Sequence, residues 1–440
     1  MDPVCIVGAG PAGLAAGAAL KARGIPFHLV DAGQGPGGLW DFERDDTPLY
    51  RSAHFISSRT LSGFPGFPMP DDYPDYPGHE RILEYLRSFA DHHGLNEDAV
   101  YGTRVVEARR EVGDASDGPW HITVQTVADG KKEAWRCSAL ILATGANWHP
   151  NVPEIPGSFS GEIRHSFQYS DAEEFRGRRV LVVGAGNSGV DIACDAARSA
   201  DRALLSLRRG YRFVPKYVFG IPADVFSHQG PRIPPWLERW VFTFLLDRVL
   251  VGDLTRYGLP RPDHPILTSH PIMNTEVLHH LGHGDLEARR DLVRFEGDEA
   301  VFQDGTRDEV DLVIFATGYR RPFPFLRHPD LDAEGEWPPE VLHLNLLHRS
   351  TPDLFVMGLF ETDGAAYGLF GEQAEVVAES LRVLSDGETG AEGLAALRGG
   401  PQPDVTGGRS YVDSRRHRYY VSERVYRRRL RELRARLDAL

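Results

Sequence analysis

Two glycine-rich turns of the same spacing are the residues in this sequence best suited to do chemistry. They are Gly8-Ala9-Gly10-Pro11-Ala12-Gly13 and Gly184-Ala185-Gly186-Asn187-Ser188-Gly189. Each follows a run of apolar residues and precedes a helical pattern, the context in which such a turn binds the pyrophosphate of a dinucleotide. Glycine is needed because the backbone must bend tightly and approach the phosphates. Two such turns in one chain predict two bound nucleotides, and that pairing suits a flavin reduced by a nicotinamide.

The residues around the first turn predict the rest of a nucleotide site. A buried strand, a helix and a second strand are expected in order at residues 4–7, 12–20 and 27–30. The second strand ends at Asp31, which lies at about the 20-residue spacing at which a carboxylate binds the ribose hydroxyls. The loop at residues 35–40, GPGGLW, offers a second approach of the backbone to the same nucleotide. Its predicted contacts are Gly38, Leu39 and Trp40.

The second turn is followed by a strand that ends in basic residues instead of an acid. A helix at residues 190–198 and a strand at 203–207 are expected, and Arg208 and Arg209 follow. Arginine at this place suits a 2'-phosphate, because its planar guanidinium matches the geometry of phosphate oxygens. The sequence therefore predicts NADPH rather than NADH as the second nucleotide, with Lys216 adding to the basic patch.

Two buried strands that end in Ala-Thr-Gly, at residues 140–145 and 312–318, divide the chain. Prolines at 150, 153 and 156 mark a crossing between domains after the first of them. We expect an α/β fold with two Rossmann-like dinucleotide-binding domains. An FAD-binding domain at 1–155 and 320–440 is interrupted by an NADPH-binding domain at 156–319, which carries a helical insertion at 220–265. The strand ends supply further predicted contacts, Thr144 and Gly145 to FAD and Thr317, Gly318 and Tyr319 to NADPH.

The composition argues against several classes of protein. The chain has 440 residues and a formal net charge of -14, which does not suit general nucleic-acid binding. Its most apolar stretch, residues 240–252, is short and carries Asp247 and Arg248, so no membrane span is expected. Three cysteines stand far apart at 5, 137 and 194. They predict neither a disulfide framework nor a redox dithiol, and they favour a reducing, cytoplasmic location.

The end of the chain, residues 409–440, is rich in arginine. Within it Val425, Leu430, Leu433 and Leu437 lie at helical spacing. We expect an amphipathic helix docked on an acidic body, with binding to a membrane surface or to RNA as the alternative.

No metal is expected, because the histidines at 92, 93, 279, 280 and 283 make no complete ligand set. The predicted partners are a small-molecule substrate and O2. The oligomeric state stays open, with a homodimer among the possibilities.

A motif just before the second turn carries a resemblance to a known family. Phe159, Gly161, His165 and Tyr169 reproduce the pattern F-x-G-x-x-x-H-x-x-x-[YF], and residues 311–324 are similar to D-x3-[LF]ATGY-x4-[HP]. GGLW at 37–40 and FPMPDDYPDYP at 67–77 are similar to the same family. Over nearly its whole length the chain resembles the class B flavin-dependent monooxygenases, specifically the flavin-containing monooxygenase group.

The resemblance implies a reaction and a set of roles. NADPH reduces FAD, O2 adds to give a C4a-hydroperoxyflavin, and a soft nitrogen or sulfur of a small molecule is oxygenated. Ile56, Ser57 and Ser58 are implied to face the flavin, Ser57 and Gln373 to contact FAD, and His165 to order the linker. The family commonly has asparagine at position 56. Isoleucine cannot donate a hydrogen bond, which predicts altered coupling of O2 activation to substrate oxidation.

Other functions stay open from the sequence alone. They are Baeyer-Villiger oxidation of a ketone, an uncoupled NADPH oxidase suggested by Ile56, and a binding protein that uses the basic tail. Relatives that insert oxygen beside a ketone typically end the linker motif with Trp-Pro or Trp-Asp, whereas here it ends with Tyr169-Ser170. A disulfide reductase would share the two-nucleotide architecture, but it needs a pair of redox cysteines that the sequence does not offer.

Overall fold

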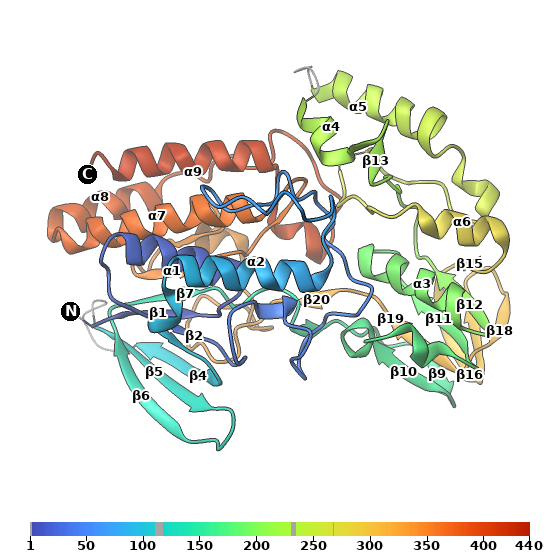
Figure 1. Ribbon diagram of the computed structural model, residues 1–440, viewed down its shortest axis with the longest axis horizontal. Helices are drawn as coiled ribbons and strands as arrows, with labels where there is room; N and C mark the ends of the chain where they lie inside the picture. Colours follow the sequence, from blue (N-terminus) through green and yellow to red (C-terminus); the bar gives the residue numbers. More distant parts are fainter. Residues whose placement is uncertain (1, 111–117, 230–234, 267) are drawn as a thin grey trace.

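The computed structural model describes residues 2–110, 118–229, 235–266 and 268–440, and it arranges them as two lobes side by side (Figure 1). Both ends of the chain lie at the outer end of the first lobe, which is coloured mostly blue and red in Figure 1. The second lobe is coloured mostly green and yellow and is built from the middle of the sequence.

The first lobe is built on a seven-stranded sheet with the order β21-β22-β23-β7-β1-β2-β3. The strands from β23 to β3 pair in parallel, and β21 and β22 add antiparallel at one edge. Central parallel strands are covered on both faces, which is why β1 and β7 are continuous apolar runs. The strands are β1 Val4–Val7, β2 Phe27–Val30, β3 Ala99–Val100, β7 Ala139–Leu142, β21 Leu342–His343, β22 Leu347–His348 and β23 Leu354–Val356.

Helices cover one face of this sheet, and a small antiparallel sheet packs on the other. α1 packs against α2 and α7, and α7 packs against α8 and α9. These helices are α1 Pro11–Ala22, α2 His79–His92, α7 Tyr367–Ser385, α8 Glu388–Gly399 and α9 Glu423–Leu437. The small sheet comprises β4 Thr103–Arg110, β5 Trp120–Thr126 and β6 Lys132–Cys137.

The second lobe repeats the design with a five-stranded parallel sheet, order β10-β19-β11-β12-β15. Its strands are β10 Glu162–His165, β11 Arg179–Val183, β12 Arg202–Ser206, β15 Glu287–Arg289 and β19 Leu312–Phe315. α3 (Asn187–Ser199) packs against α6 (Glu276–His283) and the sheet. A second sheet contains β9 Gly157–Phe159, β16 Leu292–Gly297, β17 Glu299–Phe302 and β18 Arg307–Glu309.

Two short strands join the lobes. β8 (His149–Pro150) pairs antiparallel with β20 (Tyr319–Arg320), so the chain entering the second lobe and the chain leaving it are bonded to each other. A second two-stranded pair, β24 (Glu361–Thr362) and β25 (Tyr420–Val421), ties the last segment of the chain to the first lobe.

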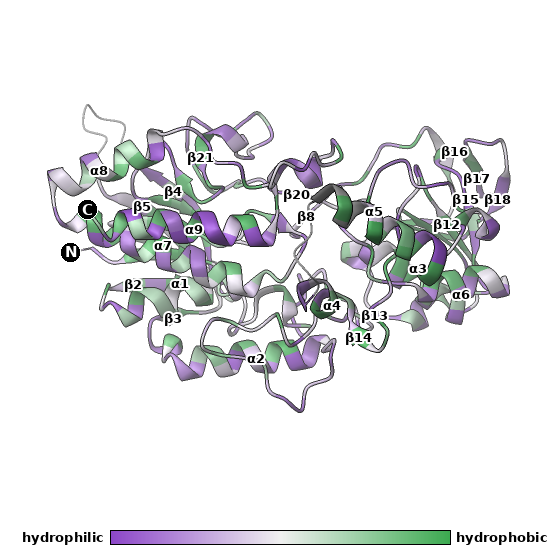
Figure 2. Ribbon diagram, turned by 90° about the horizontal axis from the view of Figure 1, so that it is seen from above, coloured by the Kyte–Doolittle hydropathy of each residue, from purple (hydrophilic) through white to green (hydrophobic). Residues whose placement is uncertain are grey.

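The predicted insertion projects from the second lobe beside the gap between the lobes (Figure 1). It holds the hairpin β13 (Tyr217–Val218) and β14 (Ile221–Pro222), then α4 (Ala223–Gln229), α5 (Pro235–Leu245) and a π-helical turn, Leu246–Leu250. Residues 230–234 of the predicted insertion lie outside the described residues. α5 is apolar along much of its visible length in Figure 2, and it leaves Trp240 and Phe244 more than half exposed.

The basic tail folds as an amphipathic helix docked on the first lobe, as expected. α9 buries Tyr426, Leu430, Leu433 and Leu437, and its outer face is largely hydrophilic in Figure 2. Three of its arginines pair with acids, Arg427 with Glu423 of the same helix, Arg431 with Glu372 and Arg434 with Glu375. The last two pairs connect the helix to α7 of the first lobe.

Among the described residues, no helix is both long enough and apolar enough to cross a membrane.

Candidate active site

The first glycine turn joins β1 to α1 and leaves no room for side chains on its inner face. Gly8 has a φ of +111°, and a Cβ there would lie 2.4 Å from the carbonyl oxygen of Ala143. A Cβ on Gly13 would lie 1.8 Å from the carbonyl oxygen of Gly8. At Gly10 the nearest atom to a Cβ is 3.7 Å away. α1 starts at Pro11 without a side-chain cap, so its first N–H groups are available to an anion.

The GGLW loop packs directly on this turn. Gly38 has a φ of +60°, and a Cβ there would lie 2.8 Å from the Cα of Gly10. The amide of Gly37 donates to the carbonyl oxygen of Ala9 at 3.0 Å. Leu39 and Trp40 follow, both half-buried. The second approach of the backbone that the sequence suggested is therefore present at the first turn.

Asp31 stands at the mouth of the same turn. Its carboxylate accepts from the amides of Ala9 and Gly33, both at 2.7 Å, and pairs with Arg44 at 2.8 Å. The side chain is only 8% exposed. Because two carboxylate oxygens offer about four acceptor positions, these three partners leave capacity for a ribose hydroxyl.

The second glycine turn has the same construction. Gly184 has a φ of +107°, and a Cβ there would lie 2.6 Å from the carbonyl oxygen of Ala316. A Cβ on Gly189 would lie 2.0 Å from the carbonyl oxygen of Gly184, whereas Gly186 has no atom within 4 Å of a Cβ among the described residues. α3 starts at Asn187, again without a side-chain cap. This turn has an open outer face and unpaired helix amides.

Two residues of the second turn, Asn187 and Ser188, have polar side chains. The amide of Asn187 donates to the carbonyl oxygen of Pro271 at 3.1 Å and accepts from the amide of Met273 at 2.9 Å. Its side chain therefore ties the turn to the segment after the insertion. Ser188 is half-buried at the helix start.

The three predicted phosphate-binding cations differ in their surroundings. Arg208 is exposed after β12, and no described residue gives it a hydrogen bond or an ion pair. Arg209 lies over the ring of Tyr211, with its Nε 4.0 Å from a carboxylate oxygen of Asp263. Lys216 lies over the ring of Tyr76, 5.3 Å from the centroid. Arg208 is the most available of the three for a phosphate.

The strand ends place two left-handed glycines facing the lobe junction. Gly145 and Gly318 have φ values of +78° and +83°. Thr144 precedes the first of them, and Tyr319 follows the second and pairs with β8. The hydroxyl of Thr317 donates to the carbonyl oxygen of Asn151 at 2.6 Å, which holds the crossing strands together.

His165 of the linker motif is a positioning residue by its contacts. Its Nδ1 accepts from the amide of Phe167 at 3.1 Å, so its Nε2 carries the hydrogen and donates to the carbonyl oxygen of Gly318 at 3.0 Å. Burial lowers the pKa of His165 to about 4, and the ring is neutral at pH 7. It links β10 to the strand that leaves the second lobe.

The other residues of the linker motif also make contacts that stabilise the fold. Phe159 stacks beside Phe295 with ring centroids 4.7 Å apart. A Cβ on Gly161 would lie 2.6 Å from a backbone carbonyl oxygen. The hydroxyl of Tyr169 donates to Asp195 at 2.9 Å. The motif that identifies the family thus fixes the linker to the second lobe.

The segment predicted to face the flavin is held by the insertion. Ile56 is 36% exposed. The hydroxyl of Ser62 donates to that of Ser57 at 2.8 Å. Ser58 is fully buried, and its amide donates to Asp224 of α4 at 2.6 Å. The hydroxyl of Ser58 has no hydrogen-bond partner among the described residues.

The glycine-rich stretch at 364–371, followed by Glu372-Gln373-Ala374, predicts a helix that starts beside Gln373. Gln373 lies instead inside α7, which begins at Tyr367 within the glycine-rich stretch. The Gln373 side chain is fully buried, accepts from the amide of Gly358 at 3.0 Å and donates to the hydroxyl of Tyr426 at 2.8 Å. Both its polar atoms are occupied within the protein, and its observed contacts support the turn after β23.

Three aromatic rings, those of Trp40, Phe55 and Tyr367, pack together beside the segment at 56–58. Trp40 and Tyr367 each lie 5.3 Å from the ring of Phe55. The hydroxyls of Tyr367 and Ser58 are buried without partners among the described residues. Buried polar atoms normally have partners. Two orphan hydroxyls, two uncapped helix starts and two glycine-rich turns are the features expected where FAD and NADPH bind.

Sequence reasoning missed two residues of this region. Tyr367 lies within the glycine-rich stretch 364–371, and an aromatic residue among glycines there could have been noted. Asp224 could not, because only the fold brings the insertion to Ser58.

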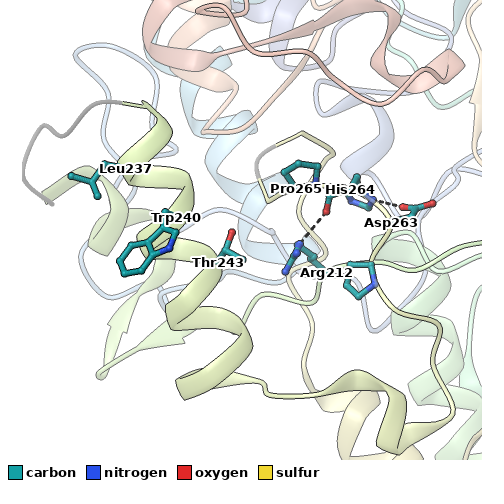
Figure 3. A pocket seen from close by; sticks show the side chains of 8 residues that line it. Arg212, Leu237, Trp240, Thr243, Asp263, His264 and Pro265 are labelled. Atoms are coloured by element: carbon teal, nitrogen blue, oxygen red, sulfur yellow. Dashed lines mark hydrogen bonds and ion pairs between the residues drawn. The ribbon is translucent and has the colours of Figure 1, made fainter.

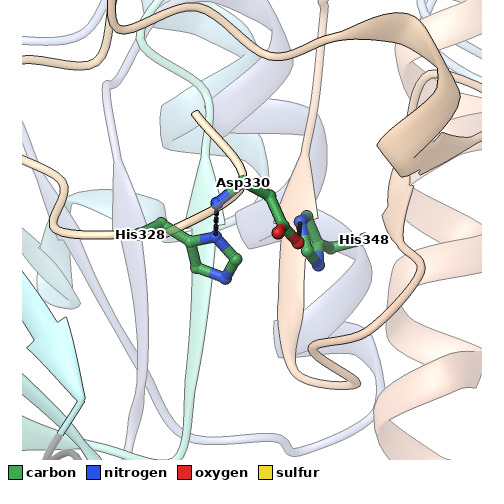
Figure 4. Close-up of side chains that lie close together, drawn as sticks. All are labelled: His328, Asp330 and His348. Atoms are coloured by element: carbon green, nitrogen blue, oxygen red, sulfur yellow. Dashed lines mark hydrogen bonds and ion pairs between the residues drawn. The ribbon is translucent and has the colours of Figure 1, made fainter. Parts of the chain in front are cut away.

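A group that sequence reasoning did not anticipate comprises His328, Asp330 and His348 (Figure 4). Backbone amides donate to Nδ1 of both rings, at 3.2 Å for His328 and 3.1 Å for His348. Each Nε2 must therefore carry the hydrogen, whereas a metal ligand needs a lone pair there and normally donates from its other nitrogen. This is a hydrogen-bonded structural group in the first lobe.

A cavity of about 880 Å³ lies between α5 and residues 262–265 (Figure 3). Leu237, Trp240 and Thr243 face it from the helix, and Arg212 and His264 face it from the other side. None of the residues predicted from the sequence to bind a cofactor lines it.

Comparisons with known proteins agree with this geometry. The family described as FMO-like, flavin-binding monooxygenase-like, matches residues 2–386. Flavin-containing monooxygenase 3 of Homo sapiens is 31% identical over 404 residues, which cover 86% of this chain and 73% of the human protein.

Two solved structures share the fold. The S-allyl-L-cysteine S-oxygenase of Allium sativum has a TM-score of 0.66 and 20% identity, over 99% of this chain and 88% of that one. OTEMO in complex with FAD and NADP has a TM-score of 0.70 and 19% identity, over 98% and 97%. The chain belongs to the flavin-binding monooxygenase-like family, and it is a monooxygenase that depends on FAD and NADPH.

Proposed function

We propose that this enzyme uses NADPH and O2 to oxygenate a soft heteroatom, nitrogen or sulfur, of a small molecule. The observation that carries the proposal is a pair of glycine-rich turns, each followed by a helix without a side-chain cap. The first turn lies beside the Asp31 carboxylate, and the second belongs to the sheet in which β12 leads to Arg208. An acid suits ribose hydroxyls and a free guanidinium suits a 2'-phosphate.

The domain assignment follows from this pairing. FAD is held by residues 1–155 and 320–440, and NADPH by residues 156–319. The boundaries fall at the paired strands β8 and β20, where the two crossings are hydrogen-bonded to each other.

In the FAD site, the amides at the start of α1 face the pyrophosphate and Asp31 faces the ribose. Gly38, Leu39 and Trp40 close one side, and Thr144 and Gly145 close another. Ser58 and Tyr367 offer their unpaired hydroxyls to the flavin ring. Gln373 acts through the Gly358 turn, because its own polar atoms are occupied.

In the NADPH site, the start of α3 faces the pyrophosphate and Arg208 faces the 2'-phosphate. Arg209 and Lys216 lie on rings of the surrounding structure and contribute positive potential. Thr317, Gly318 and Tyr319 hold the crossing that brings the nicotinamide end toward the first lobe.

The bound flavin supplies the redox chemistry with NADPH and O2, and the protein provides position and shelter. Trp40, Phe55 and Tyr367 exclude water with an apolar wall. His165 stays neutral and holds the linker, and it moves no proton of the substrate.

An NADPH oxidase is the second candidate function. Ile56 is 36% exposed beside Ser57 and offers no hydrogen bond. Without a donor at that position, the activated oxygen is expected to escape as hydrogen peroxide more readily. Baeyer-Villiger oxidation is less favoured, because the linker motif ends in Tyr169 and Ser170.

The deciding experiment is anaerobic reduction by NADPH followed by mixing with O2 and a panel of sulfides, amines and ketones, with products identified. S-oxides or N-oxides in proportion to NADPH consumed support the proposal. Esters or lactones would favour the Baeyer-Villiger reaction, and peroxide equal to NADPH with every compound would favour the oxidase.

A cytoplasmic location and a homodimer are further proposals, motivated by the three separate cysteines and by the exposed apolar face of α5. Cell fractionation and light scattering test them.

A further inference from the structure

Two aspartates on α3, Asp195 buried and Asp191 partly buried, form a pair that the proposed chemistry does not use. Asp191 and Asp195 lie one helical turn apart, and Asp195 is 5% exposed. Like charges at this spacing weaken a helix, and a buried carboxylate costs free energy unless donors surround it. α3 is also the helix that starts at the second glycine turn. The pair therefore needs hydrogen-bond donors from elsewhere.

Donors come from the second lobe itself on one side. Asn274 donates to Asp191 at 2.7 Å, and Tyr169 and Arg198 donate to Asp195 at 2.9 and 3.1 Å.

The remaining donors come from the first part of the chain. The hydroxyl of Tyr50 donates to Asp191 at 3.0 Å, and that of Ser52 donates to Asp195 at 2.5 Å. The burial of Asp191 raises its pKa, and the hydrogen bonds from Asn274 and Tyr50 oppose that rise. Each aspartate thus holds one hydroxyl from outside its own lobe.

Apolar packing fixes the same segment. Leu49, Tyr50 and Ala53 are buried in the hydrophobic core of the second lobe, although they belong to the chain that builds the first. The rings of Tyr50 and Tyr169 are 5.9 Å apart. The amide of Arg51 donates to the carbonyl oxygen of Ser170 at 2.9 Å.

This segment is short, and both its ends lead to the proposed FAD site. Gly38 to Trp40 precede it against the first glycine turn, and Ser57 and Ser58 follow it. A movement of α3 is therefore transmitted to both sides of the flavin pocket through a few residues of chain.

We propose that Tyr50 and Ser52, bound to Asp191 and Asp195, are positioning residues that fix the NADPH site relative to the FAD site. We call these four residues the interlobe latch. The inference rests on the proposed assignment of the two sites. The latch touches neither cofactor in this assignment, and it acts by setting the distance over which a hydride passes from NADPH, which is oxidised, to FAD, which is reduced.

The test uses the full-length holoenzyme with Tyr50→Phe and Ser52→Ala combined, which removes two hydroxyls and keeps the packing of Tyr50. We expect the anaerobic rate of flavin reduction by NADPH to fall by about 10-fold or more, because small misplacements are costly in transfer steps. The Kd for NADPH and the FAD content are expected to stay within about 2-fold.

A second readout does not depend on activity. Hydrogen exchange at the backbone amides of residues 49–55, measured without NADPH, is expected to become about 10-fold faster in the double variant. An unchanged exchange rate would overturn the latch.

Tyr169→Phe is the matched control. Tyr169 donates to the same oxygen of Asp195 but lies within the second lobe. It is expected to lower the Tm while leaving the flavin reduction rate within about 2-fold. Ser52→Thr keeps the hydroxyl and is expected to restore the rate when it replaces Ser52→Ala in the double variant.

The outcomes separate the latch from the proposed function. A double variant that folds and reduces its flavin at the wild-type rate overturns the latch. A wild-type enzyme whose flavin NADPH does not reduce would refute the proposed function, while hydrogen exchange would still test the latch. If the double variant does not fold, Ser52→Ala alone is expected to show the same pattern at about 3-fold, and a wild-type rate there would overturn the proposal.

Discussion

The two proposed nucleotide sites have nearly the same backbone and opposite charges. In both, the first glycine of the turn lies against the carbonyl oxygen of an alanine at the end of a neighbouring strand, Ala143 or Ala316. The last glycine of each turn lies against the carbonyl oxygen of the first glycine. The strand after each turn leads to a different side chain. In the first lobe Asp31 is held by two amides and Arg44, and in the second Arg208 is exposed and pairs with no described residue.

The difference indicates that the glycine turn gives the pyrophosphate access to the backbone, whereas the side chain at the strand end selects the nucleotide. The glycines are required by contacts that any dinucleotide site of this design would have. The side chain at the strand end tells one dinucleotide from another. Four experiments test this division, from the largest expected effect to the smallest.

Gly13→Ala should abolish the first site. A Cβ there would lie 1.8 Å from the carbonyl oxygen of Gly8, so α1 must move away from β1. We expect a loss of about 3–5 kcal/mol in the free energy of unfolding, together with loss of FAD, measured by urea unfolding and flavin absorbance.

Gly35→Ala is the control, since no described atom lies within 4 Å of a Cβ at that position. It should change the free energy of unfolding by less than about 0.5 kcal/mol. Gly189→Ala should abolish NADPH binding, as Gly13→Ala should abolish FAD binding. If Gly13→Ala kept its flavin, close approach would not be the reason for the glycine.

Arg208→Ala should raise the KM for NADPH by about 10- to 100-fold and change the KM for NADH little, because a charge-assisted hydrogen bond to phosphate is lost. Steady-state kinetics with both nucleotides measures this. Arg209→Ala is the comparison and should have a smaller effect, since that guanidinium lies over Tyr211. Equal effects on NADPH and NADH would remove Arg208 from the phosphate site.

Acid should weaken the linker between the two sites through His165. Its folded-state pKa is lowered to about 4 by burial, against an unfolded value of about 6.5. Below pH 6.5 His165 is protonated in the unfolded state but stays neutral in the folded state. The free energy of unfolding therefore decreases as the pH is lowered from 6.5 to about 4. Protonation of His165 in the unfolded state is expected to lower the free energy of unfolding by about 2 kcal/mol at pH 5.

Urea unfolding between pH 7 and 5 measures this loss, and His165→Gln should flatten the pH dependence by that amount. The interpretation would fail if the His165→Gln variant kept the wild-type slope.

Ile56→Asn should have the smallest effect, on the yield of hydrogen peroxide per NADPH. A donor at position 56 is expected to lower the peroxide yield by about 2- to 3-fold, in line with one neutral hydrogen bond. A peroxide assay beside NADPH consumption measures it, with Ile56→Val as the control. An unchanged yield would show that position 56 does not govern coupling.

Local patterns were enough to predict the strands and helices around both turns. The strand at residues 4–7 and a helix in the tail were expected from apolar periodicity and glycine spacing, and both are present. The helix expected at 190–198 is also present, but α3 starts three residues earlier, at Asn187. Gln373 was misplaced relative to its helix start, because helix boundaries depend on capping that the sequence showed only weakly. The latch was not anticipated, because its members are separated by more than a hundred residues.

The sequence by itself determined the two turns, the charge at each strand end and the family, since these depend on residues close together in the chain. Only the tertiary structure decided which polar atoms stay unpaired, that Asp224 holds Ser58, and that Tyr50 and Ser52 reach α3. The physical reason is that a hydrogen bond acts over about 3 Å. Whether two distant segments come that close is fixed by how the whole chain packs.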